Sequence, residues 1–228
     1  MTTASTYFGS MIEGYDSLIR RCVPRYEEMT ERLVEYLPAE AKHVLELGCG
    51  TGNLSLRLAA RYPDAAITFV DASPEMVELT RARVAAAHPE AAERGRFVVS
   101  RFEELAVEPE SFDLATSAIS LHHVVEKSAL FKVIRRMLAP GGTLRFADQM
   151  WGATEGNAAL NWQRWLEFCR LPGNCTEEEI GSLVAHARAH DHYEPVAAHL
   201  RMLESAGFAG VDCVWRNWMW GIVTADAV

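Results

Sequence analysis

The nine residues from Val44 to Gly52 constrain the fold more than any other stretch of the chain. They run from an apolar, strand-type segment at 44–47 into a turn with glycine at positions 48, 50 and 52, followed by a helix-type segment at 53–62. Such a turn presents backbone N–H groups at a helix N-terminus. Asn53 stands where a dinucleotide-binding loop has its third glycine, and no Gly-Lys-Ser/Thr follows as in a P-loop. The turn therefore predicts a ligand-binding loop that is neither a dinucleotide-binding loop nor a P-loop.

Strand-type and helix-type segments alternate along residues 44–147. Further apolar strand segments lie at 67–70, 97–99, 112–117 and 143–147. Helices are expected between them, one capped by Ser73 with Pro74 in its first turn and one at 127–137. This order predicts an α/β fold with a Rossmann-like, doubly wound, mostly parallel sheet and helices on both faces.

The segments on either side of this core have patterns of their own. Residues 1–40 have helical periodicity, in which Pro24 is expected to begin a second helix, and helices are also expected at 176–190 and 199–206. Residues 211–223 predict antiparallel strand elements. Because no Ser/Gly/Pro-rich linker is present, we expect one domain, 1–228, with a helical lid at 1–40, the sheet core at 41–148 and chamber and strand elements at 149–228.

Composition excludes several classes of protein. Of the 228 residues, 49% are apolar, as in a globular protein, and no uncharged stretch is long enough to cross a membrane. The formal net charge of −9 argues against a nucleic-acid partner, although Arg20, Arg21 and Arg25 could form a local basic lip. Five cysteines without framework spacing, and no apolar leader near the N-terminus, predict a cytoplasmic protein with reduced thiols.

Asp71 is the acidic residue best placed to act together with the glycine turn. It ends the second strand segment, 23 residues after Gly48. Neighbouring parallel strands end at the same edge of a sheet, so this carboxylate is expected beside the turn. A carboxylate there can accept hydrogen bonds from both hydroxyls of a ribose.

Four motifs of the core resemble those of class I S-adenosylmethionine (SAM)-dependent methyltransferases. In order they are residues 44–52 (VLELGCGTG), 69–76 (FVDASPEM), 112–117 (FDLATS) and 138–144 (LAPGGTL). The resemblance covers about residues 40–148 in the order and spacing of the family. It implies that SAM is the cofactor and that a methyl group is transferred by in-line displacement.

The resemblance also implies residue roles toward SAM. The implied contacts are Gly48, Cys49 and Gly50 with the methionine moiety, Asp71 with the ribose, Ala72 and Met76 with the adenine, and Ser117, Ala118 and Ile119 beneath the sulfonium. Met76 has an equally ordinary interpretation as a helix core residue. Many members have an acid after the third strand, where this chain has Arg101, which accepts no hydrogen bond. Either the backbone at Phe102 holds the adenine with Arg101 stacked on the ring, or Glu103 replaces the acid.

Segments 14–26 and 191–216 are similar to those of carboxy-SAM synthases and of transfer-RNA wobble-uridine methyltransferases. This similarity implies an N-terminal lid whose Tyr15, Arg20 and Tyr26 contact the cofactor. The synthases have an arginine before Ala-Gly-Phe for the extra carboxylate. Here Met202 occupies that place and Arg201 is one residue off, about 100° around a helix. Ordinary SAM is therefore the expected donor.

Histidines and tryptophans supply the remaining candidates. His122 and His123 follow the fourth strand, where either could act as a catalytic acid or base or cap the next helix. His186 and His190 share a helix face near Asp191, but without a zinc motif, so a solvated helix end is expected and no metal site. All six tryptophans lie after residue 150, where they are expected to pack the core or to line an aromatic acceptor chamber.

Together these features predict a cytoplasmic SAM-dependent methyltransferase that acts on a small-molecule acceptor. No membrane partner and no nucleic-acid partner are expected, and a homodimer is left open. Alternatives of the same fold are a carboxy-SAM synthase and a transfer-RNA wobble-uridine methyltransferase; a third is a SAM-binding module without catalysis. An aromatic chamber built by residues 150–228 favours catalysis over that third alternative.

Overall fold

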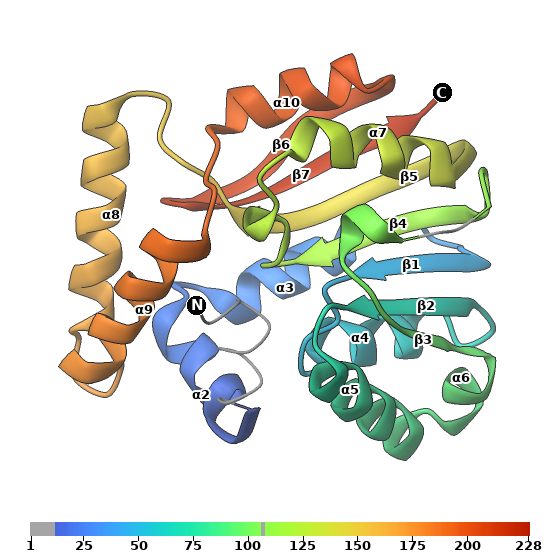
Figure 1. Cartoon of the computed structure of the whole chain (residues 1–228), viewed down its shortest axis with the longest axis horizontal. Helices are drawn as coiled ribbons and strands as arrows, with labels where there is room; N and C mark the ends of the chain where they lie inside the picture. Colours follow the sequence, from blue (N-terminus) through green and yellow to red (C-terminus); the bar gives the residue numbers. More distant parts are fainter. Residues whose placement is uncertain (1–11, 106–107) are drawn as a thin grey trace.

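The computed structural model describes residues 12–105 and 108–228 of the chain. At its centre is a seven-stranded sheet of order β3-β2-β1-β4-β5-β7-β6 (Figure 1). The strands β1 to β5 pair in parallel, whereas β7 is antiparallel to both β5 and β6. The predicted Rossmann-like sheet, mostly parallel with antiparallel C-terminal elements, is confirmed.

The described elements follow the predicted alternation. The strands are β1 His43–Leu47, β2 Ala66–Asp71, β3 Arg96–Val99, β4 Phe112–Ala118, β5 Leu138–Gln149, β6 Phe208–Asn217 and β7 Trp220–Ala227. The helices are α2 Ile12–Cys22, α3 Tyr26–Glu35, α4 Asn53–Arg61, α5 Pro74–Ala87, α6 Pro89–Arg94, α7 Lys127–Met137, α8 Glu155–Cys169, α9 Glu177–His190 and α10 Val196–Ser205. Two short 3-10 helices are η1 Phe102–Glu104 and η2 Leu121–His123.

Alternate residues of each central strand face opposite helical layers. Val44 and Ile67 belong to a buried cluster shared with α3, α4 and α5, whereas Leu45 and Val70 belong to a second cluster shared with α7 and α10. Successive strand side chains point to opposite faces of a sheet, so both faces of these strands are buried. The predicted helices on both faces are confirmed.

Local signals define most helix starts. Ser73 caps α5 by accepting the Met76 N–H, and Thr176 and Glu179 form a reciprocal capping box at α9. The expectation that Pro24 begins a helix is wrong, because the chain turns there and α3 begins only after residue 25, which has a left-handed φ of 60°. The helix expected at 199–206 begins three residues earlier, after Pro195.

Helices from both ends of the chain lie together at the carboxyl ends of the parallel strands (Figure 1). There α2 contacts α8, and Arg21 of α2 pairs with Glu179 of α9 at 2.7 Å. Open α/β sheets bind ligands at this edge. Within residues 12–105 and 108–228, no helix is long and apolar enough to span a bilayer.

Candidate active site

The glycine turn after β1 uses its glycines for different reasons. The φ angles are 79° at Gly48, 52° at Gly50 and 91° at Gly52, a region that favours glycine. A Cβ on Gly48 would lie 2.2 Å from Ser120 Oγ, so this glycine lets the turn pack against the loop after β4. A Cβ on Gly50 would meet no atom of the described residues within 4 Å, so the space beside it is open to a ligand.

Asp71, at the end of β2, lies against this turn. Its Oδ2 accepts a hydrogen bond from the Gly50 N–H at 2.9 Å, and its Oδ1 accepts one from the Ser73 N–H at 2.9 Å. Burial raises the pKa of the carboxyl, while these backbone N–H groups lower it. Each oxygen has a further lone pair for another donor. A half-buried carboxylate with spare acceptor capacity beside open space suits a ligand that carries a diol.

Asp16 of α2 ties the N-terminal helices to the glycine turn, a role for which the sequence contains no motif. Its Oδ1 accepts hydrogen bonds from Thr51 Oγ1 at 2.5 Å and Asn53 Nδ2 at 2.9 Å. Its Oδ2 pairs with Arg83 Nη1 at 2.8 Å, and Arg83 also donates to the Thr51 carbonyl at 2.6 Å. A single acid in an amphipathic helix is not distinctive, so this contact could be found only in three dimensions.

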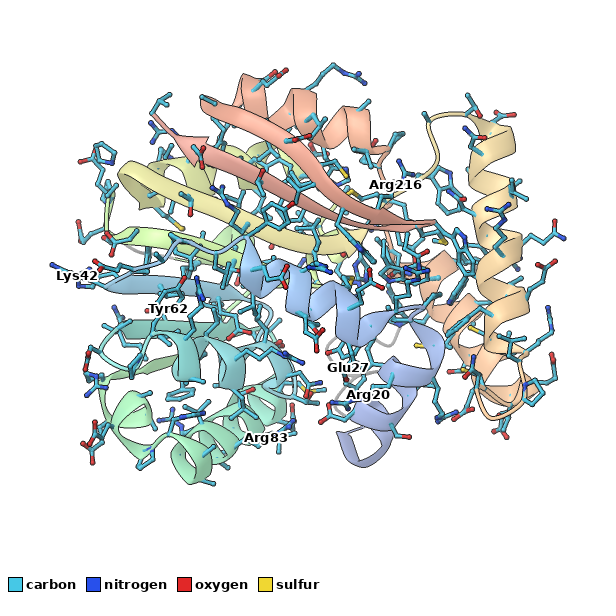
Figure 2. The ribbon with its side chains drawn as sticks, turned by 180° about the vertical axis from the view of Figure 1, so that it is seen from behind. Arg20, Glu27, Lys42, Tyr62, Arg83 and Arg216 are labelled. Atoms are coloured by element: carbon cyan, nitrogen blue, oxygen red, sulfur yellow. The ribbon has the colours of Figure 1, made fainter. Side chains whose placement is uncertain are left out.

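The N-terminal residues predicted to contact the cofactor have different surroundings. Tyr15 is half-buried and lines a pocket; burial raises the pKa of its hydroxyl, and the nearby Asp71 carboxylate adds to this shift. Tyr26 is buried at the start of α3. Arg20 is exposed, and its Nε donates to Glu27 at 2.7 Å; both residues are labelled in Figure 2. Its guanidinium lies over the Tyr26 ring. Arg20 therefore contacts α3 rather than the glycine turn.

The residues assigned to the adenine differ in exposure. Phe102 lies beside the turn, since a Cβ on Gly48 would be 3.4 Å from its ring. Ala72 is exposed just after β2. Met76 is 2% exposed inside α5, which favours its interpretation as a core residue. Arg101 is exposed, with Nε 3.8 Å from Glu103 Oε2.

The remaining predicted contacts lie in the glycine turn and at the end of β4. Cys49 is buried, and the fully buried Ser117 donates through Oγ to the Leu47 carbonyl at 2.7 Å. Ala118 and Ile119 are half-buried at the end of β4. Ile119 has a φ of 55°, which is rare for a β-branched residue and costs about 1–3 kcal/mol. Its side chain lines the pocket.

This pocket opens at the ends of β4 and β5, beneath α2, α8 and α9. Its apolar wall comes from distant parts of the chain and comprises Leu18, Ile19, Val23, Ile119, Trp165, Leu183 and Trp220. Trp165 and Trp220 are also core residues, with ring centroids 6.4 Å apart. Trp165 Nε1 donates to the Cys22 carbonyl at 2.9 Å, which joins α8 to α2. These two tryptophans therefore pack the core and line the pocket together.

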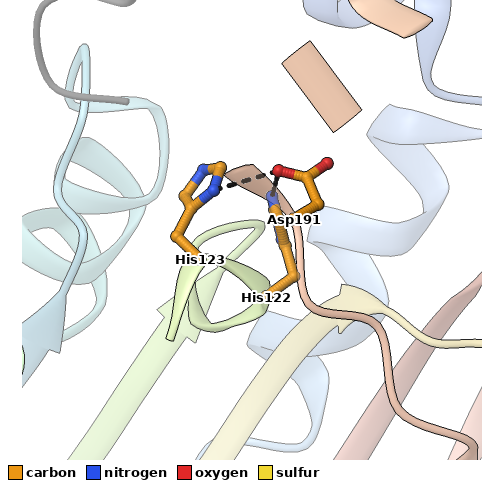
Figure 3. A group of neighbouring side chains, drawn as sticks. All are labelled: His122, His123 and Asp191. Carbon is orange, nitrogen blue, oxygen red and sulfur yellow. Dashed lines mark ion pairs between the residues drawn. The ribbon is translucent and has the colours of Figure 1, made fainter. Parts of the chain in front are cut away.

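The opposite end of the pocket is polar and is formed by His122, Gln149, His186, Asp191 and Tyr193. Asp191 lies at its centre (Figure 3). Its Oδ1 is 3.1 Å from His123 Nδ1, 3.6 Å from His186 Nε2 and 3.8 Å from His122 Nε2. Its Oδ2 accepts a hydrogen bond from the Tyr193 hydroxyl at 2.5 Å. The side chains of His186 and Asp191 are 7% and 4% exposed, so the expected solvated helix end is wrong for both.

Two further contacts hold this end together. His122 Nδ1 lies 2.5 Å from Asp148 Oδ1 at the end of β5. Lys127 is buried, and its Nζ donates to the Val124 carbonyl at 2.7 Å and to the His192 carbonyl. The loop after α9 is thereby fastened to η2, which carries the two histidines.

Burial and charge shift the pKa values of this cluster in opposite directions. Burial alone would lower the pKa of His122, but the Asp148 carboxylate outweighs it and raises the pKa overall. Burial lowers the pKa of His186 to about 4. Although burial opposes its ionisation, the imidazoles of His123 and His122 hold the pKa of Asp191 well below its usual range.

Comparison with known proteins identifies the class. Residues 44–142 match the family described as methyltransferase domain. Ubiquinone/menaquinone biosynthesis C-methyltransferase UbiE of Geotalea daltonii is 39% identical over 100 residues, which are 43% of this chain and 42% of that protein. Malonyl-[acyl-carrier protein] O-methyltransferase of Herminiimonas arsenicoxydans is 27% identical over 197 residues, 85% of this chain and 63% of that protein. The chain spans less than two thirds of the length of these curated relatives.

A solved structure shows the same fold over nearly the whole chain. The phosphoethanolamine N-methyltransferase 2 of Haemonchus contortus, in complex with SAM, has a TM-score of 0.70 at 17% identity and covers 98% of this chain and 58% of its own. The sheet order, the glycine turn with its acid and the matched family define one class. Residues 44–142 carry a methyltransferase domain similar to those of SAM-dependent enzymes, and SAM is the cofactor of that class. The residues fit this cofactor, because the open space beside Gly50 adjoins the Asp71 carboxylate, which can accept hydrogen bonds from a diol.

Proposed function

We propose that the chain transfers the methyl group of SAM to a small-molecule acceptor held in the pocket beneath α2, α8 and α9. The observation that carries this proposal is that the pocket adjoins the glycine turn, because Ile119 lines the pocket and the next residue, Ser120, packs against Gly48 and donates to the Leu47 carbonyl at 2.9 Å. One wall of the pocket is apolar and the opposite end bears titratable groups. An acceptor with an apolar body and one polar group fits such a site.

The arrangement suits methyl transfer because this reaction depends mainly on alignment. Displacement at a sulfonium is in-line, so holding two reactants in place and excluding water supply most of the rate. Bound SAM supplies the electrophilic methyl group. Gly50 and Asp71 would hold SAM, and Phe102 would border it. Ile119 would lie between the glycine turn and the pocket. The α2 helix, fastened by Asp16, would cover the site.

Without a bound metal ion, the polar end would receive the proton of an acceptor hydroxyl or amine. Of the two predicted catalytic histidines, His122 lines the pocket, with Asp148 at its Nδ1. A carboxylate at one ring nitrogen orients the imidazole and leaves Nε2 for the acceptor side. His123 faces Asp191 at 3.1 Å, so we assign it a positioning role.

Ordinary SAM is the proposed donor. Met202 and Arg201 lie in α10, which packs against β6 and α7, and Arg201 is exposed. Among the described residues that line the pocket there is no arginine. A carboxylate added to the donor would therefore have no guanidinium partner there.

A small molecule is proposed as acceptor in preference to RNA. The arginines of the expected basic lip each pair with a glutamate, which neutralises them: Arg20, Arg21 and Arg25. With a net charge of −9, little positive field is left to attract phosphates. We also propose that the chain works in the cytoplasm as one domain with divisions near residues 40 and 148.

The test is a label-transfer assay with methyl-labelled SAM and cell extract divided into small-molecule and RNA fractions. We expect protein-dependent label in the small-molecule fraction. Leu183→Trp should fill the pocket and reduce transfer at least tenfold while SAM affinity changes less than twofold. Leu160→Trp, at an exposed position of α8, is the matched control and should behave as wild type. Label confined to RNA, or SAM binding without transfer to any fraction, would contradict the proposal.

A further inference from the structure

Metal-ligating atoms from three parts of the chain meet at the polar end of the pocket. His122 and His123 come from η2 and Asp191 follows α9 (Figure 3). His186 comes from α9. One ligand atom from each of His122, His123 and Asp191 can be chosen so that all three lie within 4.8 Å of one another. Methyl transfer by alignment alone does not require such a cluster.

The spacing of these atoms is that of ligands around one metal ion. Zinc bonds of about 2.0–2.1 Å at tetrahedral angles place ligand atoms roughly 3.3–3.5 Å apart. The three nitrogen separations from Asp191 Oδ1, at 3.1, 3.6 and 3.8 Å, lie around that value. The two longer separations exceed hydrogen-bond length, and only the separation from His123 lies within it.

Second partners orient the ligands as metal sites require. Metal-binding histidines generally donate their other ring N–H to a carboxylate, and ligating carboxylates are themselves hydrogen-bonded. His122 has Asp148 Oδ1 at 2.5 Å from Nδ1, on the far side of the ring from Nε2. Asp191 receives the Tyr193 hydroxyl on Oδ2, which leaves Oδ1 directed at the imidazoles. This observation is independent of the ligand spacing.

We propose that His122 Nε2, His123 Nδ1 and Asp191 Oδ1 bind one divalent metal ion of the zinc type, with a fourth position open to the pocket. Three protein ligands and one open position are typical of catalytic zinc sites, whereas structural sites are closed. His186 Nε2 lies 3.6 Å from Asp191 Oδ1 and lines the pocket, and it is not assigned as a ligand. The proposal replaces the sequence-based expectation of no metal site.

The consequence for the acceptor rests on the proposed function. An ion held by one carboxylate and two neutral imidazoles keeps a net positive charge and lowers the pKa of a bound hydroxyl. The favoured acceptor therefore carries a hydroxyl or carboxylate oxygen. The proton of a hydroxyl passes to water, an O–C bond forms as the S–C bond of SAM breaks, and the bonding pair stays on sulfur.

The rival arrangement is a metal-free cluster in which His122 carries a proton between two carboxylates. The test is a titration of the full chain, freed of metal by a chelator, with Co²⁺ and then Zn²⁺ in the absence of SAM. We expect one ion per chain, with the visible absorption of tetrahedral Co²⁺ that Zn²⁺ displaces. Asp191→Asn and His123→Ala should weaken binding more than tenfold, and Asp148→Asn by about 10–100-fold.

His43→Ala is the matched control, because this exposed histidine lies at the start of β1, away from the pocket. It should bind metal as wild type does. The proposal is overturned if a wild-type chain that melts cooperatively does not bind metal stoichiometrically. It is also overturned if His43→Ala weakens metal binding as much as the ligand variants do. If a ligand variant fails to fold, the wild-type titration decides alone. SAM calorimetry on the same samples separates the two proposals: SAM binding without metal binding overturns only the metal site, and the reverse overturns only the donor assignment.

Discussion

At the residue scale, two glycines of the glycine turn are needed for different reasons: one for packing and the other for the space of a ligand. Gly48 has Ser120 where its Cβ would stand, whereas Gly50 has open space there. Both have left-handed backbone, so an alanine at either position is strained by about 1–2 kcal/mol. The two positions should therefore respond differently to the same substitution.

Gly48→Ala is expected to destabilise the fold by about 2–5 kcal/mol, because overpacking adds to backbone strain. Gly50→Ala should cost only the strain but reduce SAM affinity more than tenfold, because its methyl group occupies the donor space. Thermal melting without ligand and calorimetry with SAM measure the two effects. Unchanged SAM affinity in a folded Gly50→Ala protein would show that the space beside Gly50 is not the donor site.

Glu46, buried beneath the turn, makes stability depend on pH. Burial raises the pKa of its carboxyl to about 8, against an ordinary value of 4.5, although the Ser55 hydroxyl donates to it at 2.6 Å. Between these values the folded chain keeps a proton that the unfolded chain releases, so the free energy of unfolding falls as pH rises.

Glu46→Gln should therefore be more stable than wild type at pH 8, with a difference that shrinks toward pH 5 by up to about 1.4 kcal/mol per pH unit. Denaturant unfolding at several pH values measures this. Glu40→Gln, at an exposed position, is the control. A pH-independent difference between Glu46→Gln and wild type would refute the assignment of a buried, protonated carboxyl.

At the scale of elements, α2 and α3 differ in how the chain uses them. Met29 and Leu33 of α3 are fully buried in the core, so α3 is structural. The α2 helix lines the pocket with Leu18 and Ile19 and reaches the glycine turn through Asp16. We therefore propose α2 alone as the lid, in place of the predicted 1–40; residues 1–11 lie outside the described part of the chain.

Asp16→Ala should loosen α2 without unfolding the core. Because the Asp16–Arg83 pair is about one third exposed, we expect a loss of about 1 kcal/mol or less in stability, but a several-fold loss of SAM affinity. Hydrogen exchange of residues 14–22 should increase, and SAM should no longer protect them as in wild type. Glu31→Ala, on the exposed side of α3, is the control. If SAM affinity and protection match wild type, α2 is not a lid.

Elements were predictable from sequence where the signal is local. The glycine turn, the Ser73 and Thr176 caps and the alternating strands each depend on a few consecutive residues, and the fold follows from their order. The site was predictable only in part. Asp16 and Asp191 obtain their roles from partners more than 30 and 60 residues away, respectively. No local pattern marks such convergence, which is why the buried His186 resembled a solvated helix end.

At the scale of the whole molecule, the sheet edge brings both ends of the chain over one site. The central strands supply the glycine turn and Asp71, while α2, α8 and α9 supply much of the pocket that would hold the acceptor. This division is consistent with a match of residues 44–142 to a methyltransferase domain, while most residues that line the proposed acceptor pocket come from the remaining segments. The central claim is that SAM binds at the glycine turn through Asp71, beside that pocket.

The most direct test is calorimetric titration of SAM into the full chain, its Asp71→Ala variant and the exposed control Asp64→Ala. We expect one SAM per wild-type chain and the same affinity in the control. Loss of a carboxylate that accepts two hydroxyls should cost roughly 1.5–3 kcal/mol, or about one to two decades in affinity, in a variant that still melts cooperatively. Undetectable SAM binding by wild type, or equal affinity in Asp71→Ala, would contradict the account.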